Sequence, residues 1–168
     1  MRKAITILFV SLLISGMSFA QTNAKLGYID SNKILSEMPE TDSLQKELKN
    51  YADYLDQQMQ TMGQEYQKKV QDYQQNVDGM SDLIRQTKEK EITDLQQRIQ
   101  DFRASADQDL QKKQQELFNP LIQKIKDAIT AVGKENGYNY ILDIGTGAVV
   151  YYDGDNVIEL VKKKLGVK

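Results

Sequence analysis

The chain has 168 residues, of which 22 are basic and 24 acidic, and it contains no Cys and no His. The lack of Cys excludes disulfides, thiolate chemistry and Cys-based metal sites, and the lack of His removes the commonest general base and metal ligand. We therefore expect no enzyme, no metal and no cofactor, and the net charge of −2 predicts no attraction to nucleic acid. The remaining enzymatic alternative is a pocket of converging acids, for example among Asp30, Asp143 and Asp153.

Residues 1–20 have the layout of a cleavable secretory signal. Arg2 and Lys3 give it a positive start, an apolar run follows, and Ser18-Phe19-Ala20 is a small-residue cleavage site. The alternative is a membrane anchor, but the run is shorter than the roughly 20 apolar residues that a bilayer requires. We expect cleavage after Ala20, export, no stable membrane insertion and a mature charge of −4, because the signal carries two bases and no acids.

A strand and a short helix are predicted at the start of the mature chain. Leu26 to Asp30 supplies apolar and aromatic residues that are typical of a strand. Asp30 or Ser31 is suited to cap a helix that continues through Leu35. Pro39 then separates this segment from the long polar region that begins at Glu40.

Residues 40–118 are predicted to form a long, polar helical hairpin. The segment contains no Pro, and its apolar residues recur with an eleven-residue period, which keeps an apolar stripe nearly straight along a helix. Turn and capping residues occupy 78–82, and if the chain reverses there the two stripes face each other, with each pair of residue numbers adding to 161. A single uninterrupted helix is the alternative, and it would leave both stripes facing outward. The predicted seam comprises Leu44, Leu55, Met59, Met62, Tyr66 and Val77 on the first arm, and Ile84, Leu95, Ile99, Phe102 and Leu117 on the second.

Two residues bear on the continuity of these helices. Gly63 lies inside the first arm and costs about 1 kcal/mol relative to Ala, so it is either tolerated there or a hinge. Pro120 interrupts the second arm, but Leu117, Leu121 and Ile125 keep the helical phase across it. We therefore expect a kink at Pro120 and not a chain reversal.

The C-terminal part is predicted to form a β-hairpin and a closing helix. Residues 138–143 and 148–153 have strand character, and Gly145-Thr146-Gly147 between them suits a turn. Residues 157–165 have one apolar helical face. Together with 21–39, the segment 119–168 makes a small body that is marginally stable alone and has exposed strand edges, which favours an oligomer. The residues expected to form this oligomer body are Tyr28, Ile29, Tyr140, Ile141, Leu142, Val149 and Val150.

The predicted fold is α+β and mostly helical, with a long antiparallel hairpin that protrudes from a small β-containing body. This order of elements resembles the Skp/OmpH family of periplasmic chaperones. The segments that carry the resemblance are Leu26 to Asp30, Ile34-Leu35 with Pro39-Glu40, Asn119 to Ile122, Gly137 to Asp143, and Asp155 to Leu165.

The resemblance implies a periplasmic homotrimer whose bodies join through β-strands. Its three hairpins would surround a cavity that holds unfolded outer-membrane β-barrel proteins without ATP. Well-known members are basic, whereas this chain is acidic, so a lipopolysaccharide site is not transferred to Arg85, Lys88 and Lys90. The rival hypothesis is an envelope adaptor or spacer that binds one folded partner. Residues away from the seam or at the tip are the client-binding candidates, although isolated exposed hydrophobes are common: Tyr54, Met80, Leu83, Ile92 and Phe118.

Overall fold

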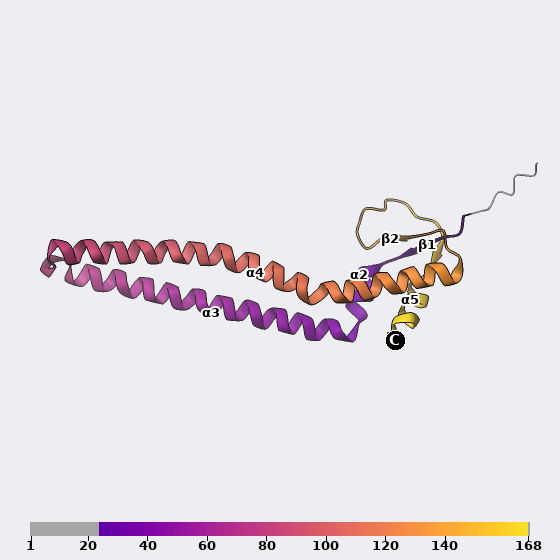
Figure 1. Ribbon diagram of the computed structural model, residues 1–168, viewed down its shortest axis with the longest axis horizontal. Coiled ribbons are helices and arrows are strands. Elements are labelled where there is room, and N and C mark those ends of the chain that lie inside the picture. The colour runs from indigo at the N-terminus through magenta and orange to yellow at the C-terminus, as the bar shows by residue number, and fades with distance from the viewer. Residues whose placement is uncertain (1–23, 168) are drawn as a thin grey trace, which may run out of the picture.

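The computed structural model describes residues 24–167, so the signal predicted for residues 1–20 lies outside the described residues. A long helical hairpin projects from a small body at one end of the molecule (Figure 1). This arrangement, with its small sheet, confirms the predicted fold class. The elements in chain order are β1 (Leu26–Ile29), α2 (Ser31–Glu37), α3 (Pro39–Asn76), η1 (Val77–Gly79), α4 (Asp82–Asn136), β2 (Tyr140–Asp143), β3 (Asp155–Asn156) and α5 (Ile158–Leu165).

The first arm is α3, a helix of 38 residues. Pro39 stands in its first turn, where a missing N–H costs nothing, and Glu40 and Asp42 complement the positive end of the helix dipole. At 1.5 Å per residue the helix extends about 57 Å. The helix runs through Gly63 without interruption, and a Cβ at this position would meet no atom within 4 Å. Packing therefore does not require a glycine at this position.

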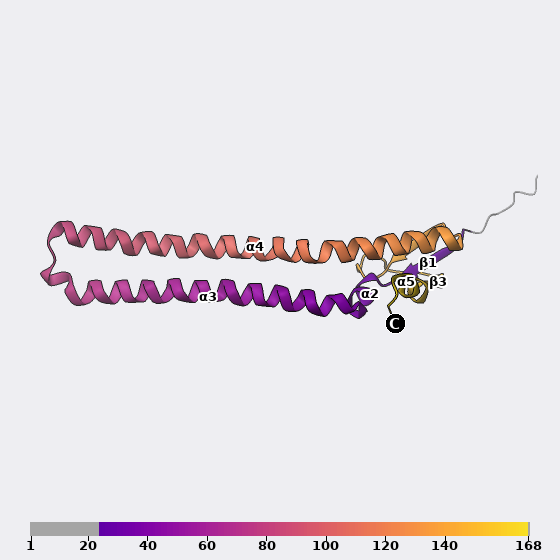
Figure 2. The same cartoon turned by 60° about the horizontal axis from the view of Figure 1, so that its bottom comes forward.

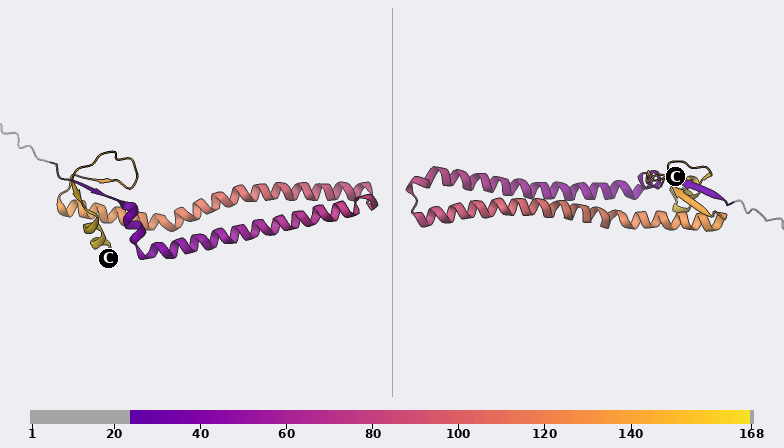
Figure 3. Two further views of the ribbon diagram at one scale, coloured as in Figure 1. Left: turned by 180° about the vertical axis from the view of Figure 1, so that it is seen from behind. Right: turned by 90° about the horizontal axis from the view of Figure 1, so that it is seen from above.

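The chain reverses in a short turn between the arms. The 3-10 turn η1 ends at Gly79, and the N–H of Met80 donates to the carbonyl of Val77 at 3.3 Å. Ser81 then caps α4, because its Oγ accepts a hydrogen bond from the N–H of Ile84 at 3.4 Å. The two arms lie side by side from this tip to the body in all views (Figures 2 and 3).

The second arm, α4, belongs to both the hairpin and the body. Its 55 residues include Pro120, which has no N–H to donate to the preceding turn, yet the helix continues to Asn136. The axis of α4 changes direction between the hairpin and the body (Figure 1). Beyond the proline, Ile125, Ala128 and Val132 are buried against the body. The helix ends because Gly137 adopts the left-handed conformation, with φ of 70°.

The body contains a parallel sheet, and the predicted β-hairpin of residues 138–143 and 148–153 is wrong. The strand order is β2-β1-β3, and both outer strands run parallel to β1. Residues 148–153 form no strand within the described chain; they belong to the long loop between β2 and β3. The physical reason is that β1 offers two edges. Strand β2 takes one of them after the long helical crossover, and β3 takes the other.

Glycine and aspartate fix the ends of that loop. The carboxylate of Asp143 accepts a hydrogen bond from the N–H of Gly145 at 3.0 Å, which turns the chain away from a hairpin. At the other end Gly154 has a φ of 152°, and a Cβ there would lie 2.6 Å from the carbonyl oxygen of Leu26. Only glycine allows the backbone to pass so close to β1 as it enters β3.

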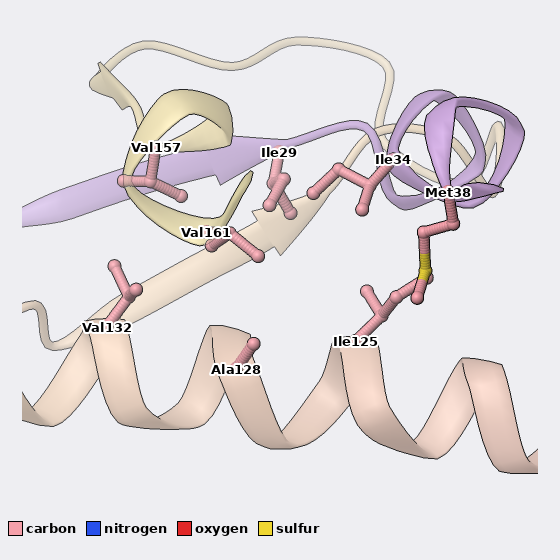
Figure 4. Close-up of a cluster of buried hydrophobic side chains, with 8 residues drawn as sticks. All are labelled: Ile29, Ile34, Met38, Ile125, Ala128, Val132, Val157 and Val161. Carbon is pink, nitrogen blue, oxygen red and sulfur yellow. The ribbon is translucent and has the colours of Figure 1, made fainter. Parts of the chain in front are cut away.

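The hydrophobic core of the body lies between the sheet and the helices that cover it (Figure 4). Side chains from β1, α2, α4 and α5 point toward one another there, and both ends of the chain contribute. The core residues are Ile29, Ile34, Met38, Ile125, Ala128, Val132, Val157 and Val161. None of the helices in the described part of the chain has a stretch that is long and apolar enough to span a membrane.

Candidate functional site

Polar contacts between the arms define how α3 and α4 are aligned. Lys69 pairs with Glu91 at 2.9 Å near the tip, and Lys113 pairs with Glu47 at 2.8 Å toward the root. Between the same arms the hydroxyl of Tyr73 donates to the carboxylate of Glu89. In each of these pairs the residue numbers add to within one of 161, the sum at which the two apolar stripes face each other.

These contacts also shift the protonation equilibria of their groups. Hydrogen bonds from Lys69 and Lys88 hold the pKa of Glu91 below its ordinary 4.5, and the same contact with Glu91 raises the pKa of Lys69. Donation to Glu89 raises the pKa of the Tyr73 hydroxyl above 10.0. The Lys69–Glu91 and Tyr73–Glu89 contacts join the two arms, so at neutral pH both stabilise the closed hairpin, whereas Lys88 lies on the same helix as Glu91.

The apolar stripes of the two arms are only partly buried. All of the predicted seam residues on the first arm are half-buried, and so are Ile99, Phe102 and Leu117 on α4. Leu95 is the exception with 2 % of its surface exposed, and Ile84 beside the tip is 50 % exposed. A pair of helices covers only one face of each stripe, so the arms keep apolar surface in contact with solvent.

Two hollows lie along the hairpin. The first, which we call the seam groove, is about 430 Å³ in volume and lies midway along the arms. The second, the tip pocket, is about 310 Å³ in volume and lies close to the turn. The seam groove is lined by Leu55, Asp56, Met59, Ile99, Arg103, Ala106 and Asp107. The tip pocket is lined by Lys69, Asp72, Tyr73, Asn76, Met80, Lys88, Glu91 and Ile92.

The structure brings together two of the five client-binding candidates. Met80 and Ile92 both line the tip pocket. Tyr54 is 54 % exposed on the outside of α3, where its ring stacks on Tyr51 with centroids 6.4 Å apart. Leu83 is exposed beside the turn, and Phe118 is half-buried at the root of the hairpin. These residues are therefore spread along the whole arm and do not form one discrete site.

Sequence reasoning did not identify the seam groove. The sequence feature that indicates the groove is the small residue Ala106 in the apolar stripe. Ala106 faces Leu55, and its side chain leaves space that a larger residue would fill. Leu55, Met59 and Ile99 were assigned to the seam, and they do line the groove. The charged residues at its edge lie off the apolar stripe, so periodicity alone does not point to them.

The acids of the body have structural roles. Asp143 accepts hydrogen bonds from the hydroxyl and the N–H of Ser31 and from the N–H of Gly145. Asp30 caps α2 by accepting from the N–H of Lys33 at 3.1 Å, and Asp153 is exposed. Within residues 24–167 there is no cluster of three or more Asp or Glu side chains that could bind a metal ion. Asp30 and Asp143 therefore stabilise a helix end and a turn.

The outer face of the sheet is apolar and exposed. The register pairs Leu26 with Tyr140 and Tyr28 with Leu142, and in this alternation all four share the face that points away from the core. Tyr140 is 67 % exposed, and Leu26 and Leu142 are also exposed. Tyr28 is partly covered by Tyr152 of the loop, with ring centroids 4.5 Å apart.

The remaining residues assigned to the oligomer body differ in their exposure. Ile29 lies in the core of the body, and Ile141 packs against that core. Val149 is half-buried in the loop, whereas Val150 is 99 % exposed. Apolar surface is thus available on the sheet face and on the loop beside it.

Comparison with known protein families gives one result that covers nearly all of the described chain. The family model of the outer membrane protein (OmpH-like) family matches residues 25–165, which include the body and both arms. None of the curated proteins gives a match. Because the match spans residues 25–165, it includes the body as well as the hairpin. The chain therefore belongs to the OmpH-like family, a family of periplasmic chaperones.

Proposed function

We propose that this protein is an ATP-independent holdase that binds unfolded outer-membrane β-barrel proteins between its helical arms and prevents their aggregation. The observation that carries the proposal is the apolar seam, most of which is only half-buried along the hairpin. Family membership supports a chaperone-type role in the periplasm. A holdase needs apolar surface that its own fold does not cover, and arms made of only two helices keep such surface.

The chemistry of the arms fits weak and adaptable binding. Met59, Met62 and Met80 have flexible side chains that adjust to irregular partners. Exposed charges and Gln residues surround the apolar stripe and keep the outer faces of the arms hydrated. Since the apolar contacts are spread along about 57 Å of helix, many small contributions would hold a client, and single substitutions on the arms would have little effect.

We propose a homotrimer as the working form. Tyr140 and Leu142 on the sheet face are apolar and exposed on the body, and so are Val150 and Tyr151 in the loop. Association of three bodies through this region would cover that surface and satisfy the open edges of the sheet. It would also place three hairpins around a common cavity, in which one client would contact several arms at once.

The test is dilution of a urea-unfolded outer-membrane β-barrel protein into buffer with and without the purified mature chain. Light scattering reports aggregation, and the mass of the complex reports its stoichiometry. We expect suppressed aggregation with one client per trimer. A folded helical protein of equal size and charge serves as the control.

Unchanged aggregation in the presence of correctly folded protein would refute the holdase for this class of client. Stoichiometric capture of one folded envelope protein, without protection of unfolded clients, would favour the adaptor instead. Circular dichroism of the chaperone in the same buffer separates these outcomes from simple unfolding.

A further inference from the structure

The net charge of the hairpin is concentrated in one segment. We define the middle third as residues 50–67 of α3 and 94–111 of α4, which face each other across the seam. This segment carries seven acidic and two basic side chains, a net charge of −5. The root, residues 40–49 and 112–118, has four acids and four bases, and the tip, residues 68–93, has five of each. The root and the tip are therefore neutral, and the whole negative charge of the hairpin lies midway along it.

The acids of the middle third are exposed, and most form no ion pair. Lys49 of the root pairs with Asp53, and Lys90 of the tip pairs with Asp94, so the two borders of the segment are neutralised. The other five acids form no ion pair with any residue in the described chain. They are Asp56, Glu65, Asp101, Asp107 and Asp109, and all of them are exposed. Their negative potential is therefore available to a ligand.

The same segment contains the seam groove. Its apolar wall consists of Leu55 and Met59 from α3 and of Ile99 and Ala106 from α4, and Asp56 and Asp107 also line it. Arg103 is the basic residue of the groove and offsets part of this charge. An apolar hollow with acids beside it favours a ligand that combines apolar side chains with positive ones.

An exposed aromatic pair lies on the same segment. Tyr54 is more than half exposed and stacks on Tyr51, and Asp56, one of the five acids without an ion pair in the described chain, lies two residues further on. The face of a tyrosine ring attracts Lys and Arg, and a carboxylate close by attracts the same cation by charge. Tyr54 thus adds a second type of contact with preference for cations.

We infer that the middle third of the hairpin is a docking surface for extended, positively charged segments of unfolded client proteins, and that this chaperone selects clients with Lys and Arg at their polar positions. The inference rests on the proposed holdase function and names its client class. An unfolded barrel strand alternates apolar and polar residues. Its apolar side chains would enter the seam groove while its cations contact the acids.

The experiment uses the full mature chain and a matched pair of clients. Both clients derive from one outer-membrane β-barrel protein kept unfolded in urea; in one form the polar positions carry Lys and Arg, and in the other Asp and Glu. The two forms carry different dyes and compete for a limiting amount of chaperone. We expect a preference of about tenfold for the cationic client, because several exposed ion pairs act together. This preference should weaken as salt is added.

Two chaperone variants test whether the preference for the cationic client depends on the acids of the middle third. The middle variant carries Asp56→Asn, Asp101→Asn, Asp107→Asn and Asp109→Asn. The control variant removes four negative charges outside the middle third, with Asp42→Asn, Asp78→Asn, Glu116→Gln and Asp127→Asn. We expect the middle variant to lose the preference and the control variant to keep it, while circular dichroism shows equal helix content.

Each result decides the question. Equal binding of both clients, a preference for the acidic one, or equal loss of preference in both variants would overturn the inference and leave the holdase function standing. Failure to hold either client would overturn both proposals.

Discussion

The body and the hairpin arms share the helix α4 but use it in different ways. In the body, Ile125, Ala128 and Val132 of this helix are buried among side chains from β1, α2 and α5. Along the hairpin the same helix packs against α3, and within residues 24–167 Leu95 is its one buried residue there. Tight packing in the body therefore comes from segments that are far apart in sequence. The arms consist of two helices only, and part of their apolar surface stays open to solvent.

The largest expected effect is on the body. Ile34 is fully buried in the core, so Ile34→Ala should lower the free energy of unfolding by about 2–5 kcal/mol through lost burial and a remaining cavity. Urea unfolding followed by circular dichroism measures this change. Met59→Ala on the half-buried seam is the matched control and should cost less than half as much. Equal costs at the two positions would contradict the contrast between body and arms.

Leu95 tests whether the arms unfold as a separate unit. We expect Leu95→Ala to weaken the hairpin by about 2 kcal/mol, at the lower end for buried leucines, because two helices can close partly around the gap. Amide hydrogen exchange should become faster in α3 and in the part of α4 before Pro120. Exchange in β1 and in the buried turns of α4 should stay unchanged. Faster exchange in both regions would mean that body and arms unfold together.

Gly63 offers a smaller effect of opposite sign. Gly63→Ala should stabilise α3 by about 0.5–1 kcal/mol, because the position is helical and a Cβ there would meet open space. Thermal unfolding measures the gain, with Gln64→Ala on the same turn as the control. A gain in stability together with weaker client binding would support the hinge, whereas unchanged binding would show that the arm works as a rigid rod.

The smallest expected effect is a pH dependence near the tip. The pKa of Glu91 is lower in the folded hairpin than its ordinary 4.5, owing first to the hydrogen bond from Lys69. A lowered carboxyl pKa stabilises the fold above the unfolded value, and this stabilisation is lost as pH falls through the folded value. Tip amides should therefore exchange faster as pH falls below about 4.5, after correction for the intrinsic exchange rate.

Glu91→Gln should remove most of this pH dependence, and Glu116→Gln is the control, because Glu116 pairs with Lys112 within α4 and not across the arms. If amide exchange at the tip of Glu91→Gln still accelerates below this pH to the same extent, a different titrating group causes the pH dependence.

The sequence predicts the arms well because their signals are local. An eleven-residue period and a capped turn around Ser81 are visible in a few tens of residues, and the helices and the tip follow from them. The body depends on contacts between its two ends, which local patterns do not reveal. Residues 148–153 have the composition of a strand, yet the edge of β1 pairs with Asp155–Asn156 instead. For the same reason Ala106 is read as one more seam residue until the structure shows the groove beside it.

The central position of β1 has a consequence for the order of folding. Leu26–Ile29 is made early, but its partners on both sides, Tyr140–Asp143 and Asp155–Asn156, come from the last 30 residues of the chain. As the chain emerges from its N-terminal side, the hairpin can pair before the body can close, because α3 and α4 need only each other to pair. At that stage the two arms are paired, and β1 still lacks both of its partner strands. Until β3 arrives, β1 is itself an extended segment with a free edge, of the kind that a chaperone binds.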